Sequence, residues 1–291
     1  MEESIGIAGA GRIGQAFGRL LHERGQTVAA VASRHAGRAA EAARFIGSTV
    51  KAVSYRNLPE HASRILIAVP DGSIACVARA LVKGGMQHGA VLHTSGAQGA
   101  DALGELASNG VSCGALHPLQ TVASPEDGVR ALTGVTFAID GEGEAVAWAG
   151  QIAGLLGGRV LRIRAASRPI YHAAAVMASN YVVALLASAG MLMKEAGVEE
   201  SAAREALGPL ARTSLENALR MGSAALTGPV ERGDSGTVRS HLEALQRVPA
   251  AVRELYRAGG LAALEIAREH GLPEARAAEI LDLLRKGAQD A

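Results

Sequence analysis

Three glycines near the start of the chain have the spacing of a phosphate-binding loop. The run Gly9-Ala10-Gly11-Arg12-Ile13-Gly14 follows a short apolar stretch and opens an amphipathic helical pattern. In that context the first glycine permits a tight turn, the second lets a pyrophosphate approach the backbone, and the third lets helix and strand pack closely. Free N–H groups at the helix start would face the phosphates. We therefore expect dinucleotide binding by Gly9, Gly11, Arg12, Ile13 and Gly14.

The end of the second predicted strand indicates which dinucleotide binds. Enzymes that use NAD usually carry Asp or Glu there, bonded to the adenine ribose. This chain has Ser33, Arg34 and His35 instead, with Arg38 one helical turn later. A carboxylate would repel a 2′-phosphate, whereas Arg34 can hold it with charge-assisted hydrogen bonds. We expect NADP(H), contacted by Ser33 and Arg34; the alternative is that Arg34 is a solvated surface charge.

Val69, Pro70 and Asp71 end a further apolar strand pattern. They would form a loop over the cofactor at the carboxyl edge of the sheet, where ligands of such sheets bind. Asp71 could equally cap the helix that follows.

Two polar clusters follow predicted strands and fall at the same edge. One is residues 93–97, with His93 and Ser95; the other is residues 117–121, with His117 and Gln120. Side chains placed there by rigid strands could orient a carbonyl or carboxylate beside a nicotinamide. For each residue, turn or capping duty is the alternative to substrate contact.

A third cluster, Tyr171, His172 and Asn180, lies on a long helical pattern. His172 and Asn180 are about 12 Å apart along a regular helix, so they could flank one substrate. An asparagine in so apolar a run must be hydrogen-bonded, which favours function or a buried network.

Further along the chain, Thr213 and Asn217 are spaced to share one face of a helix. Arg232 follows in a polar turn. It could bind a substrate carboxylate, or it could pair locally with Asp234.

The elements that must position these residues change character along the chain. The first half alternates apolar β-like runs with helical patterns, which predicts a parallel sheet wound by helices. The predicted strands are 4–9, 27–33, 64–69, 90–94, 111–116, 135–140 and 159–163, with helices at 12–23, 36–45, 74–83 and 144–156. After about residue 164 only helical patterns follow. We predict an α/β chain: a doubly wound parallel sheet in residues 1–164 and an all-α domain in residues 165–291.

Composition argues against several classes of protein, including nucleic-acid-binding and secreted proteins. The formal net charge is +1 and 20% of the residues are charged, which gives no electrostatic reason to bind nucleic acid or an anionic membrane. Cys76 and Cys113 lie too far apart for a metal motif, and we interpret them as reduced cytoplasmic thiols. No secretion signal is evident. Residues 173–193 carry no charge, but their alanine, serine and glycine content favours a helix buried in the protein or in a dimer.

These stretches together resemble the 6-phosphogluconate/β-hydroxyacid-dehydrogenase-like superfamily, which includes ketopantoate and pyrroline-5-carboxylate reductases. The chain is most similar to a bacterial family that joins a Rossmann-type domain to a helical domain formerly listed as uncharacterised. The segments that carry the resemblance are 9–14, 93–97, 115–121, 171–185 and 226–234. The resemblance implies an NADP-dependent reductase with a helical domain for substrate binding and dimerisation.

One departure affects the chemistry. Members of the wider superfamily carry Lys-x-x-x-Asn on the first long helix, with the lysine in acid/base catalysis. If Asn180 is that asparagine, Val176 occupies the lysine position and cannot move a proton. We therefore predict His172 as the proton donor, with His117 as the alternative.

The resulting hypothesis is an NADPH-dependent reductase of a small 2-keto acid, similar to ketopantoate reductase. Asn180 and Ser95 would hold the carbonyl oxygen and Arg232 the carboxylate, with Gln120, Thr213 and Asn217 also at the substrate. An imine reductase of the pyrroline-5-carboxylate type is one alternative, and a non-catalytic NADPH-binding sensor is another. We also expect a homodimer formed through the helical domain.

Overall fold

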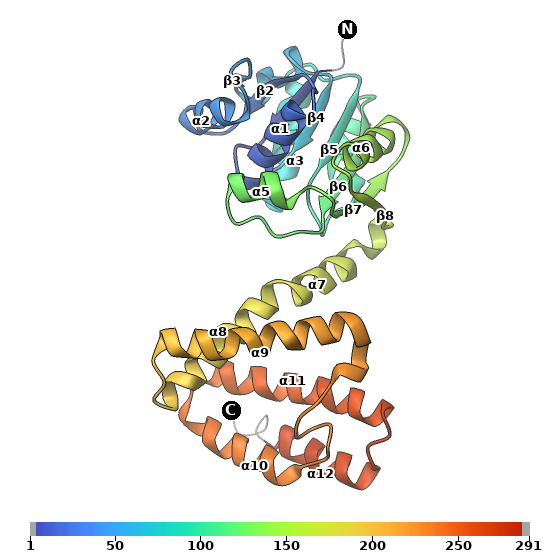
Figure 1. Ribbon diagram of the computed structural model, residues 1–291. Coiled ribbons are helices and arrows are strands. Elements are labelled where there is room, and N and C mark those ends of the chain that lie inside the picture. The colour runs from blue at the N-terminus through green and yellow to red at the C-terminus, as the bar shows by residue number, and fades with distance from the viewer. Residues whose placement is uncertain (1–3, 287–291) are drawn as a thin grey trace. The chain divides into compact units, whose positions relative to one another are not determined.

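A computed structural model describes residues 4–286, and the chain divides into two compact units between Ser179 and Asn180. The first unit is built on one sheet, whose described strands run in the order β3-β2-β1-β4-β5-β6-β7-β8 (Figure 1). These strands are β1 (Ile5–Ala8), β2 (Val28–Ala32), β3 (Lys51–Val53), β4 (Arg64–Ile67), β5 (Ala90–His93), β6 (Ser112–Pro118), β7 (Thr136–Gly141) and β8 (Arg159–Arg162). The central strands are almost entirely buried, which explains why they read as continuous apolar runs.

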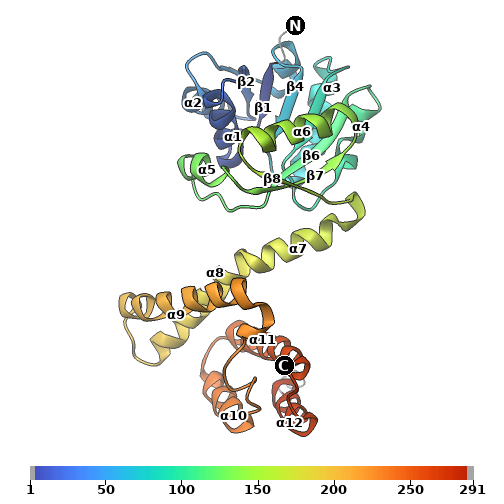
Figure 2. The same ribbon diagram turned by 45° about the vertical axis from the view of Figure 1, so that its right-hand side comes forward.

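Helices cover the two faces of this sheet. The helices of the first unit are α1 (Arg12–Glu23), α2 (Ala36–Ile46), α3 (Ile74–Lys83), α4 (Gly104–Ala107), α5 (Pro125–Ala131), α6 (Gly143–Leu155) and α7 (Arg168–Ala178). One core joins α1, α2 and α6 to one face, with Phe17, Phe137 and Trp148 fully enclosed. A second core joins α3 and α4 to the other face, and α1 and α6 can be seen crossing the near face in Figure 2. The doubly wound α/β prediction is confirmed.

One detail of the predicted sheet is wrong. β7 pairs antiparallel with β6, and β8 is parallel to β7, so the last two strands run against the other six. A strand's hydrophobic pattern has no direction, so the sequence could not show this reversal. The carboxyl ends of β1 to β6 still share one edge, with the glycine loop after β1, Asp71 after β4 and His117 in β6.

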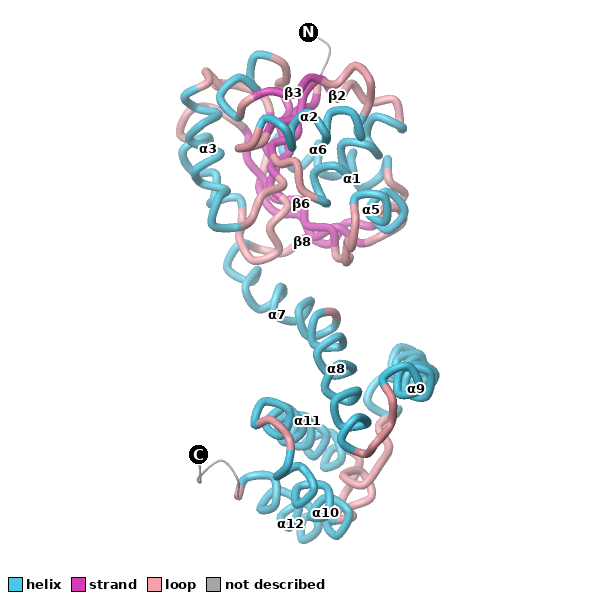
Figure 3. The backbone as a smooth tube through the Cα atoms, turned by 90° about the vertical axis from the view of Figure 1, so that its left-hand side faces the viewer, coloured by secondary structure: helices cyan, strands magenta, loops and turns pink. Residues whose placement is uncertain are grey.

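The second unit contains helices and loops, without strands among its described residues (Figure 3). It comprises α8 (Asn180–Glu195), α9 (Glu200–Met221), α10 (Ser235–Ala244), α11 (Ala250–Glu269) and α12 (Glu274–Arg285). Its core lies among α10, α11 and α12, where Val238, Leu264 and Ile280 are fully buried. α8 and α9 pack against each other and contribute almost nothing to that core.

The unit boundary falls later than the predicted position near residue 164. The difference is α7, which the contacts assign to the first unit. Arg168, its first residue, is fully buried and bonded to the carbonyl oxygens of Ser95 and Ala138, which ties the start of α7 to the sheet.

The apolar segment 173–193 is not the single helix that the sequence predicted. It is interrupted at Ser179, whose φ of −126° and ψ of −74° are not helical, so α7 and α8 are separate helices. The 12 Å spacing expected between His172 and Asn180 therefore does not apply. No residue of α8 is buried within this chain. The stretch Ala165–Glu195 is also the one candidate among residues 4–286 whose length and apolar composition would allow a membrane crossing.

Candidate active site

The glycine loop after β1 has the geometry expected of a dinucleotide site. Gly9 has φ +134°, which favours glycine, and a Cβ there would collide with the Ala68 carbonyl. A Cβ on Gly14 would collide with the carbonyl of Gly9, so this glycine lets α1 approach the strand. Gly11 is different: a Cβ there would meet nothing within 4 Å. The protein's own packing therefore does not require glycine at position 11, whereas close approach of a phosphate does.

The amino end of α1 is open to an anion. Gly11 is its N-cap and supplies no side-chain hydrogen bond, and the first turn holds no acidic residue. No acidic side chain of the first turn therefore competes with an anion for the first N–H groups of the helix. Arg12 is exposed and donates to the carbonyl of Ala123 at 3.2 Å, while Ile13 is half-buried against the core. These residues fit the pyrophosphate of a dinucleotide.

The loop after β2 offers positive charge at the place where a ribose phosphate would lie. Arg34 and Arg38 are exposed, and the first turn of α2 carries no acidic residue. The Ser33 hydroxyl accepts a hydrogen bond from the N–H of His35 at 3.3 Å. Tyr55 lies close to Arg34: burial raises the pKa of its phenol, and the nearby guanidinium opposes that rise.

The loop after β4 lies beside the glycine loop. The Val69 side chain would contact a Cβ on Gly9 at 3.1 Å, and Pro70 follows it, exposed. Asp71 is exposed too and begins a short 3₁₀ turn. α3 starts at its N-cap Ser73 without a side-chain hydrogen bond from that residue, and Asp71 lies two positions earlier.

His93, at the end of β5, is a structural histidine. It is fully buried, its Nε2 lies 2.7 Å from the Gly99 carbonyl, and its Nδ1 accepts from the N–H of Ser95 at 3.2 Å. Burial lowers the pKa of this imidazole. The Ser95 hydroxyl in turn accepts from the N–H groups of Ala97 and Gln98. Both side chains thus hold the turn after β5, and contact of Ser95 with substrate stays a prediction.

That turn brings three aromatic residues together around Gly96. A Cβ on Gly96 would collide with His172 and would lie 2.9 Å from Nε2 of His117. The His117 and His172 rings meet edge to face, with centroids 5.7 Å apart. Nδ1 of His117 lies 2.7 Å from the Tyr171 hydroxyl, and those rings are also perpendicular. The structure therefore joins His117 and His172, both predicted as candidate proton donors.

Electrostatics keep the His117 ring neutral at physiological pH. Burial lowers the pKa of His117 to about 4, and the neighbouring His172 and Arg168 add to the effect. Nδ1 of His172 is buried and has no hydrogen-bond partner within the described part of the chain. Burial raises the pKa of Tyr171, while the charge of Arg168 lowers it.

Sequence reasoning missed Arg168 and its partner Asp140. The guanidinium donates to the Ser95 carbonyl at 3.0 Å and to the Ala138 carbonyl at 3.2 Å, and its Nε lies 3.9 Å from an Asp140 carboxylate oxygen. The same carboxylate accepts from the N–H of Ala100 at 3.0 Å. These contacts link β7, the turn after β5 and α7. Nothing in the spacing of Arg168 distinguishes it from a surface arginine.

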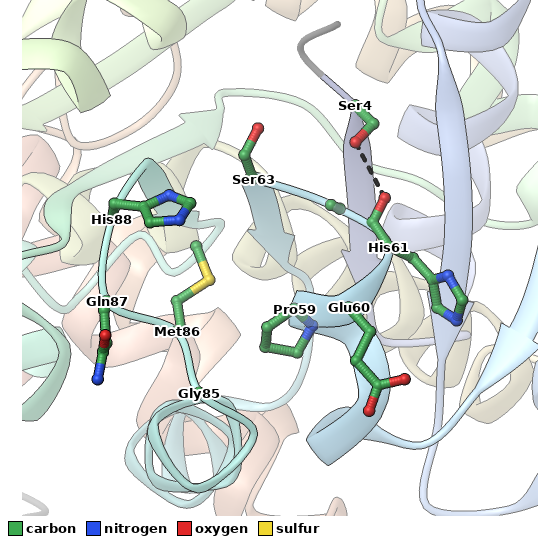
Figure 4. Close-up of a pocket in the computed structure, with 10 residues that line it drawn as sticks. Ser4, Pro59, Glu60, His61, Ser63, Gly85, Met86, Gln87 and His88 are labelled. Atoms are coloured by element: carbon green, nitrogen blue, oxygen red, sulfur yellow. Dashed lines mark hydrogen bonds between the residues drawn. The ribbon is translucent and has the colours of Figure 1, made fainter. Parts of the chain in front are cut away.

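Among the cavities of the first unit, two lie at opposite edges of the sheet. One of about 520 Å³ is lined by Asp71, the turn 97–102 and the start of α7, so it adjoins the aromatic cluster. The other, of about 260 Å³, is lined by Ser4, residues 59–63 and residues 85–88, which places it beside the amino ends of β1 and β4 (Figure 4). Figure 4 shows His61 and His88 on opposite sides of that cavity. Its residues precede the parallel strands β1, β4 and β5, so it lies at the edge opposite to the one that carries the glycine loop.

The remaining predicted residues lie outside this cluster. Gln120 is exposed, and its side-chain oxygen accepts from the N–H of Thr121. Asn180, Thr213, Asn217 and Arg232 belong to the second unit, where Asn217 accepts from Arg220. Asp234 caps α10 through the N–H of Thr237, so its carboxylate has a role that does not depend on Arg232. Substrate contact stays a prediction for Gln120, Asn180, Thr213, Asn217 and Arg232.

Two family models match the chain. Residues 2–118 match a Rossmann-like domain, and residues 135–263 match the domain of unknown function DUF2520. This pair of domains confirms the resemblance drawn from the sequence. The second match begins just before β7, so it includes the reversed part of the sheet as well as most of the helical unit. No curated protein matches the chain significantly in sequence.

Solved structures share the fold. Protein TM1727 from Thermotoga maritima is 22% identical, with a TM-score of 0.70 over 91% of this chain and 99% of that one. BF3122 from Bacteroides fragilis, described as an NADP oxidoreductase, is 23% identical, with a TM-score of 0.74 over 91% and 98%. A reductive aminase from Aspergillus terreus, solved with NADPH, is 16% identical, with a TM-score of 0.57 over 100% and 95%.

Proposed function

Since this chain joins a Rossmann-like domain to a DUF2520 domain, we propose that it is an NADP(H)-dependent reductase acting on a small 2-keto acid. The observation that carries the proposal is the glycine loop, in which Gly9 and Gly14 are required by packing and Gly11 is left open. Structural neighbours described as an NADP oxidoreductase and as a reductase bound to NADPH support the same cofactor.

The residues fit NADP(H) at both of its charged groups. The uncapped start of α1 would hold the pyrophosphate, and Arg34 and Arg38 would hold the 2′-phosphate. When bound, the cofactor supplies a hydride to the substrate. The chain's own part is to orient the substrate and to provide a proton at the carboxyl ends of β5 and β6.

The cluster at that edge suits a carbonyl substrate. Reduction of a carbonyl leaves an oxygen that must gain a proton, and His117, Tyr171 and His172 are protic groups gathered within one small region. Buried Arg168 and His93 fix the backbone around them. Small 2-keto acids of the ketopantoate type are the first class to test.

An imine is the second candidate, favoured by a separate observation. The cavity beside the cluster is lined by Asp71 and Asp101, which would attract a positively charged iminium and repel a carboxylate. Structural neighbours described as a reductive aminase and as imine reductases support this candidate.

The test combines binding with turnover. We expect NADPH to bind more tightly than NADH in a fluorescence titration, and Arg34→Glu to weaken NADPH binding at least about tenfold while NADH binding is unchanged. Arg159→Glu, an exposed arginine on edge strand β8, is the matched control and should change neither. Absorbance at the nicotinamide band then follows a panel of 2-keto acids and cyclic imines.

The outcomes distinguish the candidate functions from one another. Turnover of keto acids supports the proposal, and turnover of imines alone supports the second candidate. Tight NADPH binding without turnover would favour a sensor. Failure to bind either nucleotide would overturn the proposed function.

We also propose a homodimer formed through α8 and α9. Large apolar side chains are exposed on both helices, including Val183 at 69% and Leu219 at 80%. A membrane is the less suitable cover, because α7 is tied to the sheet by Arg168 and α8 alone has 16 residues. Such a helix is about 24 Å long, shorter than the roughly 30 Å of a hydrocarbon core. A second copy brings a matching apolar surface, as a symmetric interface requires.

A further inference from the structure

The proposed reductase reaction needs a proton donor, and the structure restricts the choice. The inference that follows rests on that proposed function. Four protic side chains lie near the carboxyl ends of β5 and β6: His93, His117, Tyr171 and His172. A donor must carry a proton at neutral pH that it can release toward the substrate.

None of the three histidines fits this role. Both ring nitrogens of His93 are occupied by backbone groups in a fully buried site. His117, with a pKa of about 4, is neutral at pH 7. Nδ1 of His172 is buried and has no hydrogen-bond partner among the described residues that could resupply it with a proton.

Tyr171 meets the requirement. Its hydroxyl keeps its proton at neutral pH, because burial raises the pKa of the phenol above its ordinary value. Arg168 acts in the opposite sense and would stabilise a transient phenolate. The hydroxyl lies 2.7 Å from Nδ1 of His117, close enough to exchange a proton with it.

The start of α7 fixes Tyr171 in place. Arg168, three residues earlier, is bonded to the carbonyl oxygens of Ser95 and Ala138. Residues three apart lie on neighbouring positions of a helix surface. The tyrosine is therefore held against β6 by the same turn of helix that the buried arginine anchors.

We propose that Tyr171 is the catalytic proton donor and that His117 is the positioning residue that resupplies it. The O–H bond of Tyr171 breaks as a new O–H bond forms on the substrate oxygen, which the hydride from NADPH has left negatively charged. The phenolate then takes the Nδ1 proton of His117. As Nδ1 gives up its proton, Nε2 of His117 takes up a proton from solvent, so the ring stays neutral. Loss of the Nε2 proton to solvent and protonation of Nδ1 then restore the starting tautomer, and the whole cycle consumes one solvent proton.

A pair of matched variants tests the donor. Tyr171→Phe keeps the ring and removes the hydroxyl, so kcat should fall about 10²- to 10⁴-fold with NADPH affinity unchanged. The control is Tyr256→Phe in the second unit. Its hydroxyl lies 2.8 Å from Nδ1 of His241, with perpendicular rings 5.9 Å apart, so the same kind of pair is removed away from the site. A Tyr171→Phe enzyme within about threefold of wild type would overturn the proposal.

The pH profile distinguishes a tyrosine from a histidine donor. With Tyr171 as donor, kcat should be level between about pH 6 and 9, whereas a histidine donor gives a rate that falls as pH rises through its pKa. The titratable and charged groups that act on the His117 ring are His172, Arg168, Asp71 and His93, and Tyr171 is its hydrogen-bond partner.

A measurement without turnover completes the test. Long-range ¹H–¹⁵N spectra of the NADP⁺-bound protein should show a neutral His117 at pH 7, with an Nδ1 resonance that shifts in Tyr171→Phe and not in Tyr256→Phe. An imidazolium signal for His117 at pH 7 would overturn the proposal. A wild-type protein that reduces neither keto acids nor imines would instead remove the proposed reductase, and this donor with it.

Discussion

The His117 imidazole links the chemistry of the site to the stability of the fold. Its pKa of about 4 in the folded chain lies below the ordinary value of about 6.5, so the unfolded chain binds the proton first as pH falls. The contribution of this ring to stability is therefore complete above pH 6.5 and is lost as pH falls toward 4. We expect wild type to lose about 1–3 kcal/mol more than His117→Asn between pH 7 and pH 4, after allowance for partial exposure.

Urea unfolding at several pH values measures this difference. His241→Asn, which removes an exposed histidine from a similar pair with Tyr256, serves as the control and should follow wild type. Parallel pH curves for wild type and His117→Asn would show that the ring is not held neutral by the fold.

At the scale of elements, the loop between β1 and α1 contains one glycine that we assign to cofactor binding and another that the fold itself requires. Gly11→Ala places a methyl group where no protein atom lies, so it should weaken NADPH binding at least about tenfold while changing the free energy of unfolding by less than about 1 kcal/mol. Gly14→Ala drives its Cβ into the Gly9 carbonyl and should destabilise the fold itself.

Fluorescence titration and thermal unfolding, run on the same samples, check both variants. Gly154→Ala, at an exposed position of α6 with open space around it, should alter neither quantity. NADPH binding at wild-type affinity by Gly11→Ala would contradict the assignment of this loop to the pyrophosphate.

The same scale shows what the sequence could and could not predict. The bounds of α1 and α3 follow from hydrophobic periodicity and agree with the structure. β3, with three residues and none of them buried, lacks such a pattern and was not predicted. The contact of His117 with Tyr171 joins residues 54 apart, and the buried bonds of Arg168 reach two strands. Local patterns do not encode such pairings, so the glycine loop was predicted and the contact between His117 and Tyr171 was not.

At the scale of the whole molecule, the two units differ in how well they bury their apolar residues. The first unit encloses large side chains such as Trp148 and Phe17 on both faces of its sheet. In the second, α10 to α12 form a small core, while α8 and α9 expose residues on several sides. Exposed apolar surface of this extent marks an interaction site on soluble proteins. The proposed dimer would cover the uncharged residues 180–193 of α8, none of which is buried within this chain.

This explanation predicts the oligomeric state and a way to change it. Wild type should be a dimer in analytical ultracentrifugation, and a charge placed in the centre of the shared surface should separate the copies, because an unpaired buried charge is strongly unfavourable. Val183→Glu on α8 and Leu219→Glu on α9 should each raise the dimer dissociation constant at least about 100-fold, equivalent to about 2.7 kcal/mol. Val160→Glu, on an apolar residue of β8 that is 45% exposed, should leave the dimer intact. A monomeric wild type would contradict the proposed interface, and a dimer that survives both helix variants would locate the contact elsewhere on the chain.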